Sequence, residues 1–405
     1  MASTPTIIIA GAGIGGLTAA LALARVGLRV RVLEQAARLE ETGAGLQLSA
    51  NATRILIALG LEEPLRSRVV APEAVRVRQA ANGEDLARLP VGRSLRQYGA
   101  PYWVIHRGDL QAALLAAVND HPDITVELDA RVQVFGPHPK GVMVGYLRKS
   151  GTADATGTAF VGADGLWSAA RACLGEKSPP RPADRTAWRA LVPADAVPTE
   201  FREPAVNLWV GPKAHLVHYP VRAGGAINIV AITTDAWRGT GWSTRSDRAE
   251  LLTRFSERNW AWPARKLLAT PSQWLKWALY DRPPMDRWGR GAATLLGDAA
   301  HPMLPFLAQG AAMAIEDAAV LAHALARALG GAAAALRYYE SQRRPRTAKV
   351  QAAARTNDRI YHLGGPAAVI RDLAMRTVLG GDLLLSRYDW IYDWRPPVEF
   401  GGAMS

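Results

Sequence analysis

The sequence predicts an α/β fold in which a Rossmann-like domain is interleaved with a mostly antiparallel β-sheet domain and followed by C-terminal helices. Three observations predict it. The glycine-rich turn 11–16 follows the apolar run 7–10 directly. A second apolar run, 292–296, ends far downstream at Gly297-Asp298. Between them, residues 180–290 are rich in tryptophan, proline and short β-like runs, which is typical of an antiparallel sheet.

The composition is that of a globular protein. Of the 405 residues, 49% are hydrophobic and 21% are charged, which allows two or three lobes around large cores. The net charge is +12, but the arginines are scattered, so the excess favours anionic small molecules or only solubility, and no nucleic-acid partner is expected. Short apolar runs and one cysteine, Cys173, predict a cytoplasmic protein without stable membrane association. No metal site is expected.

Hydrophobic periodicity assigns the elements in order. Residues 1–179 form the first part of the Rossmann-like domain: strand 6–10, helix 17–26, strand 29–33, a helix from Asn51, helix 106–118, a β-meander of 124–128, 131–135 and 141–147, and a strand that ends at 162–165. Residues 180–290 form the sheet domain, with strands 186–191, 206–210, 215–219 and 226–233. Residues 291–362 return to the first domain with helices 310–330, 334–342 and 346–359, broken at Pro345, and 363–405 form a helical and aromatic tail.

The first turn has the spacing of a phosphate-binding motif. Gly11, Gly13 and Gly16 form a G-x-G-x-x-G sequence between a strand and a helix, where a pyrophosphate can approach backbone N–H groups at a helix N-terminus. Glu34 ends the second strand, and a carboxylate there accepts hydrogen bonds from ribose hydroxyls and repels a 2′-phosphate. Because these features agree, FAD or NAD is favoured over NADP, and a packed turn with a surface Glu34 is the alternative.

Three further positions place polar groups where a cofactor could reach them. Arg107 opens helix 106–118 and is expected either to face phosphate or sugar groups or to be solvated. Asp164 ends a buried strand between two glycines, which is also the composition of a tight turn. Asp298 follows another buried strand, and the helix from Gly310 would direct its positive N-terminal end at a bound flavin.

Taken together, these motifs resemble the single-component FAD-dependent aromatic hydroxylases, in the branch of salicylate hydroxylase, 3-hydroxybenzoate 6-hydroxylase and 6-hydroxynicotinate 3-monooxygenase. The resemblance covers nearly the whole chain. It implies an enzyme that hydroxylates an aromatic ring through an FAD C4a-hydroperoxide, with O2 as oxidant and with NADH or NADPH as a transient reductant. The resemblance also leads us to expect a homodimer.

The resemblance also implies roles for individual residues. The ADP half of FAD would lie on the turn Gly11, Gly13, Ile14, Gly15 and Gly16 and on Glu34. The remaining cofactor contacts would come from Gln47, Arg107 along the ribityl–pyrophosphate stretch, Asp164, Asp298, and the backbone N–H groups of Gly310 and Ala311. Pro302 would lie by the isoalloxazine near the oxygen site.

The substrate side is expected on strand 215–219. His215 and Tyr219 are four residues apart and therefore point to the same face, whereas His218 points to the other. The resemblance implies that this pair faces the substrate. His215 would then draw a proton from a phenol and so raise the electron density of the phenol ring. The alternative is a pair of half-buried strand residues that meet core and solvent.

The expected substrate is a phenolic or hydroxylated heteroaromatic carboxylic acid. Pro305 and Phe306 occupy loop positions where the hydroxybenzoate and hydroxynicotinate enzymes carry polar contacts, so the pocket is expected to be more apolar. This departure and the many tryptophans of 180–290 favour an alternative substrate: a larger apolar phenol, a quinolone or an alkene. A more remote alternative is a non-catalytic dinucleotide-binding regulator.

Overall fold

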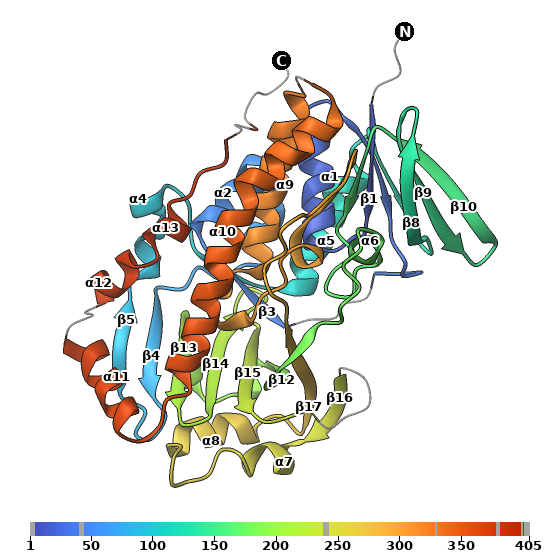
Figure 1. Cartoon of the computed structure of the whole chain (residues 1–405). Helices are drawn as coiled ribbons and strands as arrows, with labels where there is room; N and C mark the ends of the chain where they lie inside the picture. The colour runs from blue at the N-terminus through green and yellow to red at the C-terminus, as the bar shows by residue number, and fades with distance from the viewer. Residues whose placement is uncertain are drawn as a thin grey trace.

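Two sheets organise the molecule (Figure 1). The computed structural model describes residues 5–39, 44–237, 243–328, 330–377, 381–397 and 400. The parallel sheet has the order β18 (Ala293–Leu295), β11 (Ala159–Gly162), β1 (Thr6–Ala10), β2 (Arg29–Leu33) and β7 (Ile124–Glu127). The large sheet has the order β16 (Ser243–Asp247), β17 (Gln273–Asp281), β12 (Arg181–Pro193), β15 (Ala226–Thr234), β14 (Ala214–Val221), β13 (Ala205–Gly211), β4 (Ala74–Gln79) and β5 (Asp85–Leu89). The predicted α/β fold is therefore confirmed.

The parallel sheet forms because β1 is apolar on both faces. Ile7, Ile8 and Ile9 are almost fully buried, as both sides of a parallel strand must be when helices cover them. One cover is α1 (Ile14–Arg25), whose alanines allow close contact with α9 (Gly310–Ala326) and α5 (Arg107–Asn119). Helix α1 begins inside the glycine motif and earlier than predicted, because Gly13 is its N-cap.

The prediction for 124–128 was wrong in its pairing. This segment does not join the meander; as β7 it pairs in parallel with β2, with Val30 opposite Ile124. The reason is that α5 precedes it and returns the chain to the edge of the parallel sheet, which is the usual crossover between parallel strands. The meander instead consists of β8 (Arg131–His138), β9 (Gly141–Arg148) and β10 (Gly151–Gly157).

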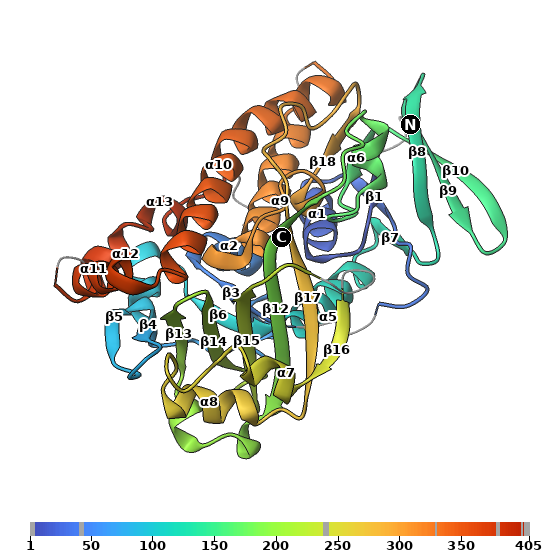
Figure 2. The same ribbon diagram turned by 60° about the horizontal axis from the view of Figure 1, so that its bottom comes forward.

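The large sheet has two different faces. One is covered by α7 (Arg248–Leu252) and α8 (Trp262–Ala269), which Figure 2 shows in front of its strands. Trp188, Trp209 and Trp274 are buried in this layer. The sheet also takes in β4 and β5, which were not predicted: β4 pairs in parallel with β13 and antiparallel with β5. The boundary between the two domains at residue 180 stays a prediction.

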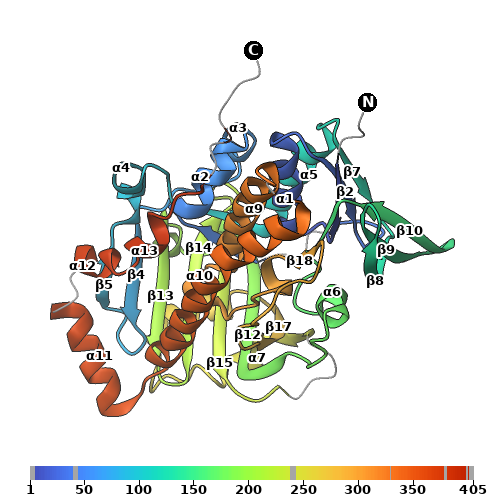
Figure 3. The ribbon, with the colours of Figure 1, turned by 45° about the horizontal axis from the view of Figure 1, so that its top comes forward.

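Helices complete the fold. The predicted break at Pro345 is wrong, because α10 (Ala332–Tyr361) continues through it. Helix α10 runs beside α9 and on across the strands of the large sheet (Figure 3). The other helices are α2 (Ala50–Ala58), α3 (Glu62–Arg66), α4 (Ser94–Tyr98), α6 (Ala169–Cys173), α11 (Gly365–Thr377), α12 (Gly381–Ser386) and α13 (Asp389–Tyr392), and β3 (Gly45–Leu48) pairs with β6 (Trp103–His106). None of the helices in these ranges has the length and apolar character of a membrane span.

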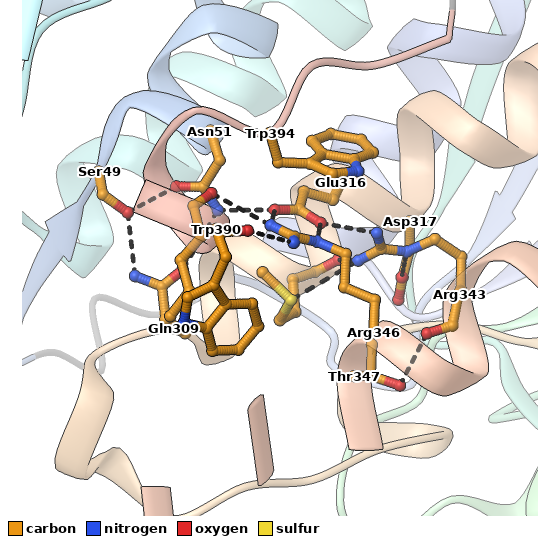
Figure 4. A network of polar contacts seen from close by, with 12 residues as sticks. Ser49, Asn51, Gln309, Glu316, Asp317, Arg343, Arg346, Thr347, Trp390 and Trp394 are labelled. Atoms are coloured by element: carbon orange, nitrogen blue, oxygen red, sulfur yellow. Dashed lines mark hydrogen bonds and ion pairs between the residues drawn. The ribbon is translucent and has the colours of Figure 1, made fainter. Parts of the chain in front are cut away.

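A buried ionic network explains the uninterrupted α10 (Figure 4). Arg343 Nε donates to Asp317 Oδ1 and Arg343 Nη1 to Glu316 Oε2, both at 2.6 Å. Arg346 Nε also reaches Glu316 Oε2 at 2.6 Å. These arginines flank Pro345, so ion pairs to α9 hold the helix on both sides of the hydrogen bond that a proline removes.

The network extends to the turns that surround α9. Asp317 Oδ2 accepts a hydrogen bond from the Gly297 backbone N–H at 3.0 Å and lies 2.6 Å from His301 Nε2. Burial alone would raise the pKa of Asp317, but the neighbouring His301 and Arg343 lower it to about 2. Asn51 Nδ2 donates to Glu316 Oε1 at 2.7 Å, which joins α2 to the same cluster. Charged side chains of this network therefore hold the turn before Asp298 in place.

Replacement of Arg343 by methionine is expected to lower the free energy of unfolding by about 3–5 kcal/mol, because the buried Asp317 loses its arginine and the buried Glu316 keeps only Arg346. Chemical denaturation followed by circular dichroism measures it. The matched control is Arg66→Met: Arg66 pairs with Glu63 at 2.8 Å on the surface, and its loss should cost less than about 1 kcal/mol. Equal losses in the two variants would contradict this account.

Candidate active site

A single cavity of about 1230 Å³ extends from the parallel sheet to the large sheet. At one end its wall contains the glycine turn after β1, and at the other end it contains side chains of β12, β14, β15 and β17. Of the predicted site residues, the cavity brings together Gly11, Gly13, Ile14, Gly15, Glu34, Gln47, Arg107, Asp164, His215, Tyr219, Asp298, Gly310 and Ala311. Residues far apart in the sequence therefore share one cavity.

The glycine turn leaves room for a ligand. A Cβ on Gly16 would lie 2.0 Å from the Gly11 carbonyl oxygen, and Gly11 has a φ of +102°, so both positions require glycine for the backbone itself. A Cβ on Gly13 would meet nothing within 4 Å. Gly13 is also the N-cap of α1, and no side chain caps that helix. Its first N–H groups are thus free to bind a phosphate at the open side of the turn.

Glu34 is held beside this turn by two backbone contacts. Its Oε2 accepts a hydrogen bond from the Ala12 N–H at 2.7 Å, and its Oε1 accepts one from the Ala36 N–H at 2.8 Å. Each carboxylate oxygen has a further lone pair. Glu34 can therefore accept two hydroxyl hydrogen bonds from a ribose while it stays in place.

The start of α9 supplies a second helix N-terminus in the cavity wall. Gly310 and Ala311 begin this helix, which has no side-chain cap and no acid in its first turn. Arg107, at the start of α5, and Asp298 also line the cavity. Burial raises the pKa of Asp298, and the charges of His301 and Arg107 oppose the increase. Two helix N-termini and a guanidinium suit the phosphates of a flavin cofactor and the negative charge that its ring carries when reduced.

Asp164 and Gln47 line the same cavity with part of their polar atoms already bound. Asp164 accepts hydrogen bonds from Ser168 Oγ at 2.5 Å and from the Ala170 N–H at 3.0 Å, so it holds the start of α6. Burial raises its pKa. Gln47 Oε1 accepts a hydrogen bond from the Tyr102 hydroxyl at 2.8 Å. Both residues can contribute to a ligand site only through their remaining atoms.

His215 and Tyr219 lie on the cavity side of β14 together with Val217. His218 lies on the opposite face, against Phe201 and the indole of Trp209. Burial lowers the pKa of His215 well below its ordinary value, and the nearby His362 and Arg185 lower it further. The imidazole is therefore neutral in the free protein. Burial raises the pKa of Tyr219, which keeps its phenol protonated.

Two predicted residues do not line the cavity. Gly16 is buried at the turn, and Pro302 is buried with its carbonyl oxygen accepting a hydrogen bond from Gln351 Nε2 at 2.7 Å. Met303 and Pro305 form the wall at that point instead. Phe306 is also absent from the wall; its ring packs against His215, with 5.5 Å between the ring centroids. Phe306 therefore acts on the pocket through His215.

Arg189 was not predicted from the sequence as a site residue. This side chain of β12 lines the cavity, and its guanidinium lies 4.3 Å from the ring centroid of Trp277. Its Nε is buried and has no hydrogen-bond partner among the described residues. Burial lowers the pKa of Arg189 to about 10, so it remains a cation. The signal in the sequence was an arginine within the segment 187–192, whose other residues are all apolar.

Comparison with known proteins identifies the family. The chain matches the model of the FAD binding domain over residues 3–354. It is 37% identical over 396 residues to 3-hydroxybenzoate 6-hydroxylase of Klebsiella oxytoca, with 98% of each chain covered. The chain belongs to the single-component FAD-dependent aromatic hydroxylases. It is also 38% identical over 392 residues to 3-amino-4-hydroxybenzoate 2-monooxygenase PtmB3 of Streptomyces platensis, with 96% of each chain covered.

Solved structures share the fold over nearly the whole chain. HpxO of Klebsiella pneumoniae, complexed with FAD and uric acid, has a TM-score of 0.82 and 27% identity, with 95% of each chain covered. A salicylate hydroxylase substrate complex also has a TM-score of 0.82, at 24% identity, and covers 98% of this chain and 97% of that one. The predicted family, enzyme class and FAD cofactor are confirmed. The roles of the individual site residues stay predictions.

Replacement of Gly13 by alanine should leave the fold intact and weaken FAD binding about tenfold or more, because the new methyl group occupies the open side of the turn. Thermal unfolding of the apoprotein and flavin titration measure the two effects. Gly136→Ala is the matched control: Gly136 also has free space around its Cβ position, but it lies on β8 outside the cavity wall. Unchanged FAD affinity in Gly13→Ala would count against this phosphate site.

Proposed function

We propose that the protein uses NADH or NADPH and O2 to hydroxylate a phenolic or hydroxylated heteroaromatic carboxylic acid. The observation that carries the proposal is the continuous cavity, which joins the glycine turn to a wall with a neutral imidazole, a phenol and a guanidinium whose Nε has no hydrogen-bond partner among the described residues. The relatives named above are hydroxylases of hydroxybenzoates, which are phenolic acids. A homodimer and a cytoplasmic location stay predictions.

The cofactor end follows from the contacts already described. FAD, when bound, supplies the redox chemistry that takes electrons from a reduced nicotinamide and activates O2. The glycine turn and Glu34 would hold its ADP half. Arg107 and Asp298 would bind the ribityl–pyrophosphate stretch, and the N–H groups of Gly310 and Ala311 would bind the ring. The positive N-terminal end of α9 would stabilise negative charge on the ring.

At the other end, His215 would act as a general base. It would take the proton of a phenol hydroxyl, so that the ring carbon becomes a better nucleophile for the oxygen atom. A neutral imidazole is the required form, and burial holds His215 in it. Tyr219, which stays protonated, would donate a hydrogen bond to the same substrate.

Arg189 favours an acid over a neutral phenol. Arg189 lines the cavity and forms no ion pair with a carboxylate of the described residues, and a substrate carboxylate fits a guanidinium with two hydrogen bonds. The second candidate is a larger apolar phenol, a quinolone or an alkene. The apolar wall formed by Val217, Val230 and Ile232 favours that candidate. The two candidate substrates differ in whether they carry the negative charge of a carboxylate.

Comparison of a hydroxybenzoate with its methyl ester tests the substrate class. Arg189→Met is expected to raise KM for the acid about tenfold to a hundredfold, the value of a hydrogen bond to a charged group, and to leave KM for the ester unchanged. NAD(P)H oxidation with product analysis measures both. Arg78→Met is the matched control, because Arg78 lies 4.7 Å from the Trp209 ring outside the cavity wall. A wild-type preference for the ester would favour the larger apolar phenol.

Replacement of His215 by asparagine should lower the rate of hydroxylation by about 10²- to 10⁴-fold, because a general base is lost. FAD affinity should not change. In the wild type, the acid limb of the pH profile of kcat/KM is expected below pH 6.5, since the pKa of His215 is lowered and the base stays unprotonated as the pH falls. His218→Gln, on the opposite face, is the control. An acid limb above pH 7 would exclude His215 as the base.

A further inference from the structure

A line of polar groups leads away from the cavity behind His215. His215 Nδ1 lies 2.8 Å from His362 Nε2. The other nitrogen of that ring, His362 Nδ1, lies 3.0 Å from Asp358 Oδ1. Arg185 Nε donates to the same Asp358 oxygen at 2.8 Å. The line begins on β14, in the cavity wall, and ends at a carboxylate that is partly exposed.

The three groups fix the position of each proton. If His215 Nε2 is to accept a proton from the cavity, Nδ1 must carry the hydrogen and donate it to His362 Nε2. His362 Nε2 must then be the acceptor, so the hydrogen of that ring is on Nδ1, which faces the Asp358 carboxylate. With these tautomers the hydrogen of His362 lies on the nitrogen that is 3.0 Å from the Asp358 carboxylate, at an ion-pair distance rather than in a hydrogen bond, and the charge of Asp358 favours it there.

We propose, on the basis of the proposed function, that His362 and Asp358 are positioning residues that orient His215 and accept the positive charge it gains from a phenolic substrate. The phenol O–H bond breaks and an N–H bond forms at His215 Nε2. The Nδ1–H bond of His215 breaks in turn, and the proton moves to His362 Nε2. The result is a phenolate in the cavity and an imidazolium at His362 beside the Asp358 carboxylate.

His362 is a better place for that charge than His215. It is the C-cap of the 30-residue helix α10, where the partial negative charge of the helix end favours a cation. Asp358 lies one turn earlier on the same helix. Burial alone would raise the pKa of Asp358, but its contacts with His362 and Arg185 lower it, so it is ionised. At His215, by contrast, burial opposes a charge.

The surroundings of the two rings contain few other charges. From α10, Tyr361 faces His215 with 5.6 Å between ring centroids, and Phe306 contributes an apolar ring at 5.5 Å. From β12, Arg185 is the charge that acts on both His215 and Asp358. A pH effect on substrate ionisation would therefore report on this line of groups.

The test is the ionisation of a phenolic acid bound to the FAD-loaded enzyme, followed by ultraviolet difference spectra across pH without reductant. In Asp358→Asn the pKa of the bound phenol is expected to rise by about 1, which is a tenfold change in the equilibrium, and the rate of hydroxylation is expected to fall about tenfold. The Kd of the corresponding methoxy acid, which has no proton to give, should stay unchanged. His362→Gln breaks the line at a second point and should act in the same way.

Asp281→Asn is the matched control. Asp281 on β17 also pairs with an arginine of α10, Arg355, at 2.7 Å, but among the described residues no hydrogen bond or ion pair joins this pair to a histidine. It should leave the pKa of the bound phenol unchanged. If His215→Asn impairs phenol ionisation while Asp358→Asn and His362→Gln behave as wild type, the roles proposed for His362 and Asp358 are wrong. His215 then remains the proposed base. If His215→Asn has no effect, the proposed function itself fails.

Discussion

The ion pairs between α9 and α10 are the constraint on which the active site depends. Glu316 and Asp317 are fully buried, and carboxylates in such a place require cations, which Arg343 and Arg346 provide. Through Asp317 the cluster also holds the Gly297 turn. The uncapped N-terminus of α9 and the turn that carries Asp298 thus keep their positions by a network that lies outside the cavity.

Helix α10 connects the two ends of the cavity. Its middle pairs with α9, next to the proposed flavin site, and its last residues lie behind His215 on β14. One rigid element therefore sets the distance between the group that would receive electrons and the group that would activate the substrate. Hydroxylation requires such a fixed distance, because the reacting atoms must meet in an enclosed volume.

The sequence predicts local structure here better than long-range pairing. The βαβ start, the acids at strand ends and the face shared by His215 and Tyr219 follow from spacing alone. The pairing of 124–127 with β2 and the recruitment of 74–89 into the large sheet do not, because alternation does not specify a partner. Arg189 and His362 were missed for the same reason: each gains its meaning from neighbours that are distant in sequence.

The most direct test of the central claim, that this cavity holds FAD and a phenolic acid together for oxygen transfer, is an isotope measurement. The FAD-loaded enzyme turns over a hydroxybenzoate with NAD(P)H under ¹⁸O2, and mass spectrometry follows the product. The account predicts a hydroxylated acid with one ¹⁸O atom, in an amount that matches the nicotinamide oxidised. Nicotinamide oxidation that yields only hydrogen peroxide with every phenolic acid, or a product whose new oxygen comes from water, would contradict it.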